Sequence, residues 1–356
     1  MDLNSINCQK PSAGTTTNNS FMSRFRGQWV NALLFVGCVG WAGGLASCNS
    51  SSTTGTLGDW TRGSALDGVA RTGASSFVIG NIAYLGTGVD SDNNRLTDFW
   101  SYDPSRNAWT QKANYAGVGR IYGVGFAAAN KGYIGTGTNA NGDRLKDFYE
   151  YDPSANTWKK IADFGGSARR NATAFSINNI GYVGTGFDGN FVKDMWSYNP
   201  TTATWSQSAS YGGDKRTGAL AFVIDGKAYM GTGNNNGTLQ RDWWVYDPTQ
   251  NLWTQKLQFT TDQSAIARNY GVGFAINGKG YVVAGTGASS SNTPVWQYDP
   301  ATDTWTTLGV FEGADRQYAQ GFAIGNKGYV TTGGVSSRTD DLWIFDPTVT
   351  QNTDAY

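Results

Sequence analysis

The hydrophobic and polar positions of this chain recur with a period of about 50 residues, which is typical of a repeat architecture. In each repeat an arginine is followed six residues later by a phenylalanine that begins a short apolar run. Six such pairs occur: Arg71/Phe77, Arg120/Phe126, Arg169/Phe175, Arg216/Phe222, Arg268/Phe274 and Arg316/Phe322. The chain therefore contains six copies of one unit.

The sequence pattern of each unit predicts four short strands. In the first repeat a strand of small residues runs into Phe77, a Gly-Asn pair at 80–81 makes a turn, and further strands follow around Tyr84, Trp100 and Trp109. The turn pairs are mostly Gly, Asn and Asp, which tolerate the positive φ that a type I′ hairpin requires. Four antiparallel strands of this length form one blade of a β-propeller. We therefore expect an all-β, six-bladed propeller.

Small residues occupy alternate positions of the first strand in every repeat, as at Ala74 and Ser76. Because strand side chains alternate between faces, one face of this strand is nearly bare. Such a strand suits the innermost position, where blades converge on the axis. The recurring Phe and Trp side chains, each burying about 150–250 Å², are expected to fill the wider space between blades.

These residues resemble the kelch repeat, which has a leading Arg, an apolar hairpin, a Gly pair after Tyr, Asp-x-Trp, Tyr-Asp-Pro and a closing Trp. The resemblance covers residues 59–347 and implies a kelch-type propeller. Three positions depart from the pattern. Tyr149 replaces the Trp of the second repeat, Asn199 replaces the Asp of Tyr-Asp-Pro in the third, and Pro294 replaces the Asp of Asp-x-Trp in the fifth.

The two ends of the repeat region are incomplete in complementary ways. Asp59-Trp60-Thr61 matches the start of a fourth strand with no strands before it, whereas the last repeat reaches Pro347 without a closing Trp. We expect the N-terminal segment to supply the outer strand of the last blade, which closes the ring and removes an open edge. Residues 348–356 are expected to be a loose tail.

Residues 1–48 read as a secretory signal. Arg24 and Arg26 precede an apolar stretch that ends in Leu-Ala-Ser-Cys. This ending resembles a bacterial lipobox, which implies lipidation of Cys48, and Met22 is an alternative start of the signal. The competing interpretation is a transmembrane anchor, but the stretch is shorter than the roughly 20 apolar residues that a span needs.

A lipidated Cys48 would place the mature protein at the bacterial cell envelope, attached to the outer membrane by its lipid alone. Residues 49–58 are small and polar, which predicts a flexible tether. Cleavage would also remove Cys8 and Cys38, so no disulfide can form inside the mature chain.

Loop length predicts which face of the propeller is functional. Connections after the first and third strands of a blade lie on one face, and those after the second and fourth lie on the other. The second set varies in length and sequence, and variable loops on a rigid scaffold commonly carry binding. Within repeats these loops are Val89–Thr97, Thr138–Lys146, Phe187–Lys193, Asn234–Arg241, Thr286–Asn292 and Gly334–Asp340.

The six leading arginines begin their strands on this variable-loop face and permit two interpretations. They could form a basic ring around an acidic ligand, or each could pair with a nearby Asp of Asp-x-Trp. Those carboxylates are Asp98, Asp147, Asp194, Asp242 and Asp341. Recurrence in every repeat favours the structural pairs, because a ligand would not need six equivalent arginines.

The residues two positions after each arginine differ between repeats, as expected of a site in a symmetric scaffold. They are Gly73, Tyr122, Asn171, Gly218, Tyr270 and Tyr318. Tyr122, Asn171, Tyr270 and Tyr318 are therefore ligand-binding candidates, with burial in the core as the competing interpretation for each Tyr. Glu312 and Asp315, in the connection between the last two repeats, are further candidates.

Composition limits the chemistry. The chain has 27 basic and 27 acidic residues and no His. Balanced charge gives no electrostatic case for nucleic acid. The lack of His rules out Ser-His-Asp and Cys-His nucleophiles and His-ligated zinc or copper. Galactose-oxidase-type copper chemistry, known in some kelch propellers, is thereby argued against, and no cofactor is expected.

Two loops alternate carboxylate and amide residues in the manner of a calcium loop: Asp90–Asp98 and Asn139–Asp147. Both place an arginine, Arg95 or Arg144, where a calcium loop requires Gly. We therefore expect solvated turns and no metal site.

Glu312 is the one acid that we would test for catalysis, because Glu occurs only at positions 150 and 312 and general acid–base work needs only a carboxylate. We expect a non-enzymatic binding module that recognises a glycan or an envelope protein through the variable-loop face. The alternative is a sugar epimerase or mutarotase, similar to the sialic acid epimerase propellers. A closed ring has no free sheet edge, so we expect a monomer.

Overall fold

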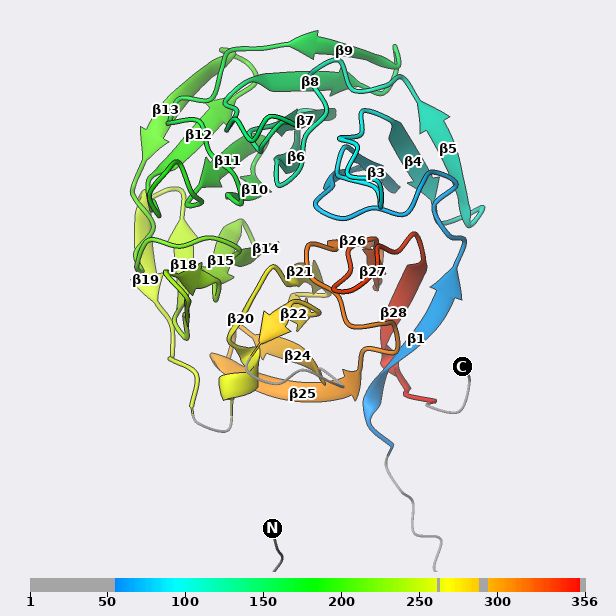
Figure 1. Ribbon diagram of the computed structural model, residues 1–356. Helices are drawn as coiled ribbons and strands as arrows, with labels where there is room; N and C mark the ends of the chain where they lie inside the picture. Colours follow the sequence, from blue (N-terminus) through cyan, green and yellow to red (C-terminus); the bar gives the residue numbers. More distant parts are fainter. Residues whose placement is uncertain (1–54, 261–262, 288–293, 353–356) are drawn as a thin grey trace, which may run out of the picture. The chain divides into compact units, whose positions relative to one another are not determined.

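The computed structural model describes residues 55–352 except 261–262 and 288–293. The predicted signal segment with Cys48, most of the tether and residues 353–356 lie outside these ranges. The described strands form six four-stranded antiparallel sheets, arranged as blades around a central axis (Figure 1). The predicted six-bladed all-β propeller is confirmed. None of the described residues forms a helix long and apolar enough to span a membrane.

Within each blade the strands are named in order from the axis outward. Blade 1 contains β2 (Ser75–Ile79), β3 (Ile82–Gly86), β4 (Phe99–Asp103) and β5 (Ala108–Lys112); blade 2 contains β6 (Val124–Ala128), β7 (Lys131–Gly135), β8 (Phe148–Asp152) and β9 (Thr157–Lys160). Blade 3 contains β10 (Thr173–Ile177), β11 (Ile180–Gly184), β12 (Met195–Asn199) and β13 (Thr204–Ser208); blade 4 contains β14 (Leu220–Ile224), β15 (Lys227–Gly231), β18 (Trp243–Asp247) and β19 (Leu252–Gln255).

Blades 5 and 6 carry the departures from this regular order. Blade 5 contains β21 (Val272–Ile276), β22 (Lys279–Val283), β24 (Pro294–Asp299) and β25 (Thr304–Val310); blade 6 contains β26 (Gln320–Ile324), β27 (Lys327–Thr331), β28 (Leu342–Thr350) and β1 (Leu57–Gly63). Two small ribbons, β16 (Asn234–Asn235) with β17 (Thr238–Leu239) and β20 (Arg268–Asn269) with β23 (Thr286–Gly287), and a 3-10 turn, η1 (Ser264–Ile266), lie in the variable loops.

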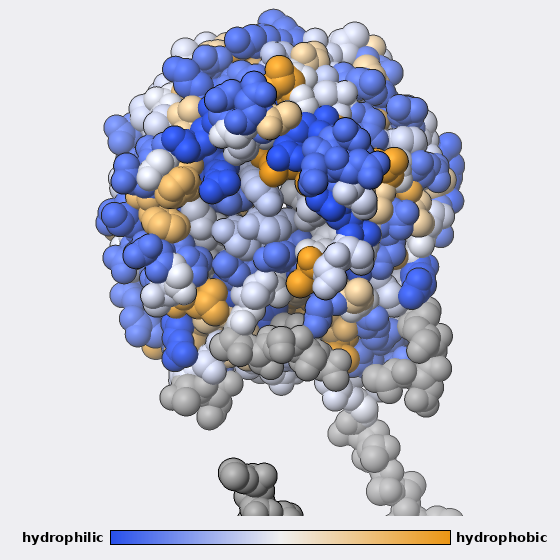
Figure 2. All heavy atoms as spheres, viewed as in Figure 1, coloured by the Kyte–Doolittle hydropathy of each residue, from blue (hydrophilic) through white to orange (hydrophobic). Residues whose placement is uncertain are grey.

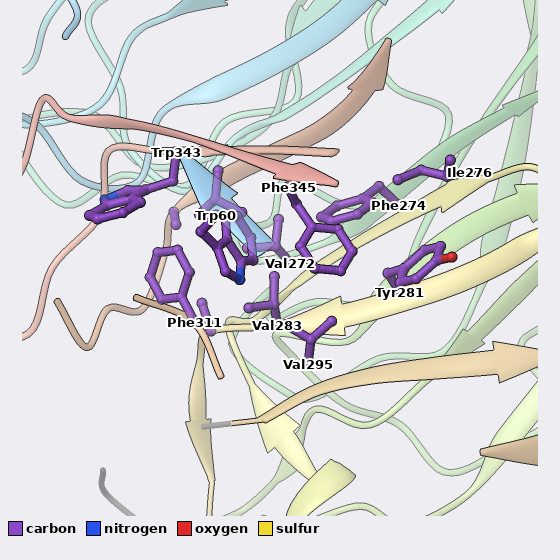
Figure 3. Close-up of a cluster of buried hydrophobic side chains, with 13 residues drawn as sticks. Trp60, Val272, Phe274, Ile276, Tyr281, Val283, Val295, Phe311, Trp343 and Phe345 are labelled. Carbon is purple, nitrogen blue, oxygen red and sulfur yellow. The ribbon is translucent and has the colours of Figure 1, made fainter. Parts of the chain in front are cut away.

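Large aromatic side chains of one blade pack on glycines of the next. A Cβ on Gly132 of β7 would lie 1.9 Å from the ring of Phe77 in blade 1, so only Gly fits there. Between blades 5 and 6, Phe274 and Tyr281 share one buried cluster with Trp60 and Phe345 (Figure 3). The core therefore lies between blades, as the sequence predicts.

The hairpins at the inner edge use two kinds of turn. In blades 2 to 5 both turn residues have positive φ, as the type I′ prediction requires. In blades 1 and 6 only the first turn residue, Gly80 or Gly325, does so. A Gly at the first position alone is the pattern of a type II′ turn, so the type I′ prediction is wrong for these two blades.

The N-terminal strand closes the ring, as predicted. β1 pairs with β28 in an antiparallel register in which Trp60 faces Phe345. β28 continues through Asp346-Pro347 to Thr350, although Asp-Pro opens a turn in the other blades. Pro347 has no N–H to pair, and the register shifts at Gly58 on the opposite strand (φ 101°), which accommodates the proline.

The extension of β28 corrects the expectation of a loose tail from residue 348. Residues 348–350 belong to the strand, and the side chain of Gln351 makes hydrogen bonds to Val310 at the end of β25, the outer strand of blade 5. Its Oε1 accepts from Val310 N at 2.9 Å and its Nε2 donates to Val310 O at 2.9 Å. The chain is therefore fastened through residue 351.

Candidate functional site

The six leading arginines are buried, and their side chains bond to groups of their own blade and of the connection that leads into it. Arg71, Arg120, Arg169, Arg216 and Arg316 each make a bidentate pair with the Asp of their own blade's Asp-x-Trp motif. In blade 4, for example, Arg216 donates to Asp242 at 2.6 and 2.8 Å. These guanidinium groups are not available to a ligand.

The same carboxylates accept a second buried donor. In the four blades that carry both the Asp and the Trp of the motif, the Trp Nε1 donates to the Asp at 2.7 or 2.8 Å. Burial alone would raise the pKa of Asp98, Asp194 and Asp341, but the hydrogen bonds and charge of the paired arginine hold it below its ordinary value. The carboxylates therefore remain ionised at neutral pH.

Blade 5 lacks this arrangement. Pro294 replaces the Asp, and Arg268 donates only to main-chain carbonyls of Ile266, Ala265 and Ala284. No carboxylate pairs with Arg268 among the described residues.

The six residues two positions after the arginines form a closed hydrogen-bonded circle, which we call the axial ring. It consists of Gly73, Tyr122, Asn171, Gly218, Tyr270 and Tyr318. Each N–H donates to the carbonyl of the equivalent residue in the preceding blade, at 3.0 to 3.4 Å, and all six residues have positive φ. The ring lies where the inner strands begin, on the variable-loop face.

The ring brings the three predicted tyrosines together at the axis. Tyr318 stacks on Tyr270 with ring centroids 4.0 Å apart and lies 4.5 Å from Tyr122. Burial, with the neighbouring tyrosines, raises the pKa of Tyr318. The cavity that these side chains line with Asn171 measures only about 130 Å³, below the roughly 300 Å³ of a typical ligand pocket. The tyrosines therefore mainly fill the axis.

A larger groove lies between the variable loops of blades 1 and 2, and we call it the asparagine groove. It has a volume of about 440 Å³. Its walls are Asn93, Asn94, Arg95, Val118, Gly119, Asn139, Ala140 and Asn141. Figure 2 shows the surrounding face, where hydrophilic loops border a hollowed centre.

Both loops of the groove are held rigid by internal hydrogen bonds. Asp90 Oδ1 accepts from the N–H groups of Asp92 and Asn94, and Asn139 Oδ1 accepts from those of Asn141 and Asp143. The alternating carboxylate and amide residues therefore serve to stabilise the turns of their own loops. No cluster of metal-ligating side chains is found within the described part of the chain.

Several further arginines on this face make no ion pair among the described residues. Arg338 of blade 6 donates to Asn93 at 3.1 Å, Arg95 borders the groove, and Arg144 and Arg170 lie over the ring of Phe187 at 5.8 and 5.5 Å. These four arginines are not among the predicted site residues. Three of them lie three residues before an Asp-x-Trp carboxylate: Arg95, Arg144 and Arg338. This recurrence is the feature of the sequence that could have identified them.

Glu312 and Asp315 lie apart from the tyrosines and the groove. Glu312 Oε1 accepts from Gln351 Nε2 at 2.8 Å, near the end of the closing strand. Its Oε2 is buried without a partner among the described residues, and burial raises its pKa. Asp315 is exposed. Neither lines the axial cavity or the asparagine groove.

Comparisons with known proteins address the fold. Residues 58–230 match a family model described as the KLHDC2/KLHL20/DRC7 Kelch-repeats domain. A solved structure titled "Structure of YjhT" superposes with a TM-score of 0.66 at 17% identity, covering 78% of this chain and 95% of that one. A search of curated proteins found no match. The sixfold repeat, the six four-stranded blades and the Kelch-repeat match together establish that this chain is a kelch-repeat β-propeller.

Proposed function

We propose that this propeller is a non-enzymatic carbohydrate-binding module that uses the asparagine groove on its variable-loop face. The groove volume carries the proposal, because about 440 Å³ falls within the range of small-molecule sites. Its walls suit a sugar. An asparagine amide carries both an acceptor oxygen and donor N–H groups, which match the two roles of a hydroxyl group. Asn93, Asn94 and Asn139 each use part of this capacity within the loops, whereas both ends of the Asn141 amide are open to a ligand within the described residues.

The remaining wall residues complete the chemistry. Val118 is 54% exposed and offers an apolar surface to the C–H face of a sugar ring. Arg95 supplies donors that no carboxylate occupies within the described residues. The rigid turns behind Asn94 and Asn141 limit the ordering that binding would require.

The test is a glycan array probed with purified residues 50–356. Asn141 is the best residue to change, because it is exposed and its side chain makes no hydrogen bond to the described residues. Asn141→Ala combined with Arg95→Gln should abolish binding to the glycan that the parent selects. Asn190→Ala, in the matching loop of blade 3, should leave binding intact. Binding that survives the groove changes would refute the site.

A blank array with folded protein would instead favour an envelope protein as the partner. The axial tyrosines lie on the same face as the groove, so a separate variant must test their contribution to binding. Changing Tyr122, Tyr270 and Tyr318 together should weaken binding less than the groove variant does. A larger effect would move the site to the axis.

A sugar epimerase or mutarotase is the second candidate. It is motivated by Glu312, whose raised pKa and unpartnered buried oxygen are features of a general acid. It ranks second because Glu312 lies outside both cavities on the variable-loop face. If the Glu312→Gln variant interconverts sugar anomers as fast as the parent protein, the catalytic role of Glu312 is refuted.

We also propose that the module is held at the bacterial envelope by a lipid on Cys48. The support is the lipobox-like ending at residues 45–48. Cys48→Ser should move the protein from the membrane fraction to the soluble fraction and abolish incorporation of a labelled fatty acid.

A further inference from the structure

Arg268 of blade 5 is a buried cation whose usual partners are absent. Its side chain is 0% exposed, as are those of the paired arginines in blades 1, 2 and 4. Four of the five arginines that pair with an Asp also lie over an aromatic ring: Arg120, Arg169, Arg216 and Arg316, at 4.7 to 5.1 Å. Arg268 has neither the carboxylate nor such a ring among the described residues.

The contacts that remain are all neutral. Arg268 Nε donates to Ile266 O at 3.2 Å, Nη1 to Ala284 O at 2.9 Å and Nη2 to Ala265 O at 2.8 Å. One N–H on each Nη atom is left over, since guanidinium has five. Burial lowers the pKa of Arg268 to about 10, which leaves it protonated at neutral pH.

Trp296 also lacks the carboxylate that its counterparts in other blades bind, among the described residues. It is 6% exposed, and its Nε1 is buried without an acceptor in the described residues. Trp296 faces Val282 in the sheet register, as Trp244 faces Met230 in blade 4, where Nε1 donates to the carboxylate of Asp242. Blade 5 thus keeps the two kinds of donor that bind a carboxylate in blades 1, 3, 4 and 6.

A buried charge requires a counter-charge, because transfer of an isolated ion into a protein interior is strongly unfavourable. We propose that blade 5 binds a small monovalent anion, of about the size of chloride, between Arg268 and Trp296. Arg268 is 0% exposed and Trp296 only 6% exposed, so a ligand that reaches both must be small. The ion takes the place that the Asp-x-Trp carboxylate holds in the other blades.

The test is thermal unfolding at fixed ionic strength, with chloride replaced stepwise by gluconate, which is too large to enter. The unfolding temperature should rise by about 2 °C when chloride reaches ten times its dissociation constant. Pro294→Asp supplies a carboxylate and should abolish the dependence, whereas Pro294→Ala adds no charge and should retain it. No chloride dependence in the parent protein would overturn the proposal.

Two further measurements identify the source of the charge. The chain carries Asp262 six residues before Arg268, outside the described residues. If only Asp262→Asn gained chloride dependence, that aspartate would be the counter-charge and the proposal would be wrong. Crystals soaked in bromide should show anomalous scattering between Arg268 and Trp296. Its absence there would also overturn the proposal.

Discussion

In blades 1, 3, 4 and 6 the Asp-x-Trp carboxylate accepts from both a buried Arg and a Trp, so its loss leaves two donors without their acceptor. Asp98 accepts from Arg71 at 2.6 and 2.5 Å and from Trp100 Nε1 at 2.7 Å. The recurrence of the leading Arg and of the Asp-x-Trp Asp in the repeats predicted five of these pairs. It also identified Pro294 as the exception. The neutral carbonyl contacts of Arg268 could not be predicted, because they depend on the backbone path of one variable loop.

We expect Asp98→Ala to destabilise the protein strongly. Arg71 is 0% exposed and would lose the one ion pair that it makes with the described residues, and breaking such a pair typically costs about 3–5 kcal/mol of unfolding free energy. The control is Asp92→Ala, a change at an exposed carboxylate in the same blade, which should cost under about 0.5 kcal/mol. Urea unfolding measures both. Similar losses would show that the pair contributes little.

The same carboxylates predict how stability depends on pH. The pKa of Asp98, Asp194 and Asp341 is lower in the folded protein than its ordinary value of 3.8. Their stabilisation is therefore present above about pH 4 and is lost as pH falls through the folded pKa. Glu312 has a raised pKa, so its contribution has the opposite sign, being present at low pH and lost as pH rises through that pKa.

The expected profile is flat between about pH 6 and about pH 8, because the chain has no His to titrate there. The free energy of unfolding should then fall steeply below about pH 4. Urea unfolding across this series provides the measurement. A steady decline that begins near neutral pH would contradict the assignment to these aspartates.

At the scale of elements, the start of each inner strand is fixed by the axial ring. All six ring residues have positive φ, which Gly73, Gly218 and Asn171 adopt readily and the three tyrosines do not. The sequence marked these positions because they differ between repeats. It did not show that they bond to one another, because the circle closes only when all six blades are in place.

We expect Tyr122→Gly to be more stable than Tyr122→Ala by about 1 kcal/mol. Both variants lose the contact with Tyr318, but Ala must hold a φ of 60°, where its Cβ costs about 1–2 kcal/mol that Gly avoids. Urea unfolding compares the two. Ala174→Gly, at ordinary φ in β10, should lose stability instead. If Gly and Ala at position 122 were equal, the ring backbone would not be strained.

At the scale of the whole molecule, the sequence predicted the ring and its closure but not the asparagine groove. Closure followed from two complementary defects at the ends of the repeat region. The groove arises where loops of adjacent blades approach each other, and its width depends on the angle between blades. Asn94 and Asn141 were therefore noted as possible calcium ligands within separate loops, without any indication that they share a groove.

Closure of the ring predicts that Trp60 differs from its counterparts in other blades. Trp60 packs against Phe311 and Phe345, with ring centroids 4.8 Å away in each case. Trp253 holds the equivalent position in blade 4 and packs against Tyr211 and Tyr246 at 5.0 Å. Replacing either by Ala should cost about 3–5 kcal/mol of unfolding free energy from lost burial.

Only Trp60→Ala should also open the ring. β19 follows β18 directly in the chain, whereas β1 is held on β28 by non-covalent contacts, so its release exposes the edge of β28. Hydrogen exchange should then accelerate in Leu57–Gly63 and Leu342–Thr350, and sedimentation should show self-association that grows with concentration. Trp253→Ala should show neither effect under conditions where it remains folded. Equal behaviour of the two variants would mean that closure depends on contacts other than Trp60.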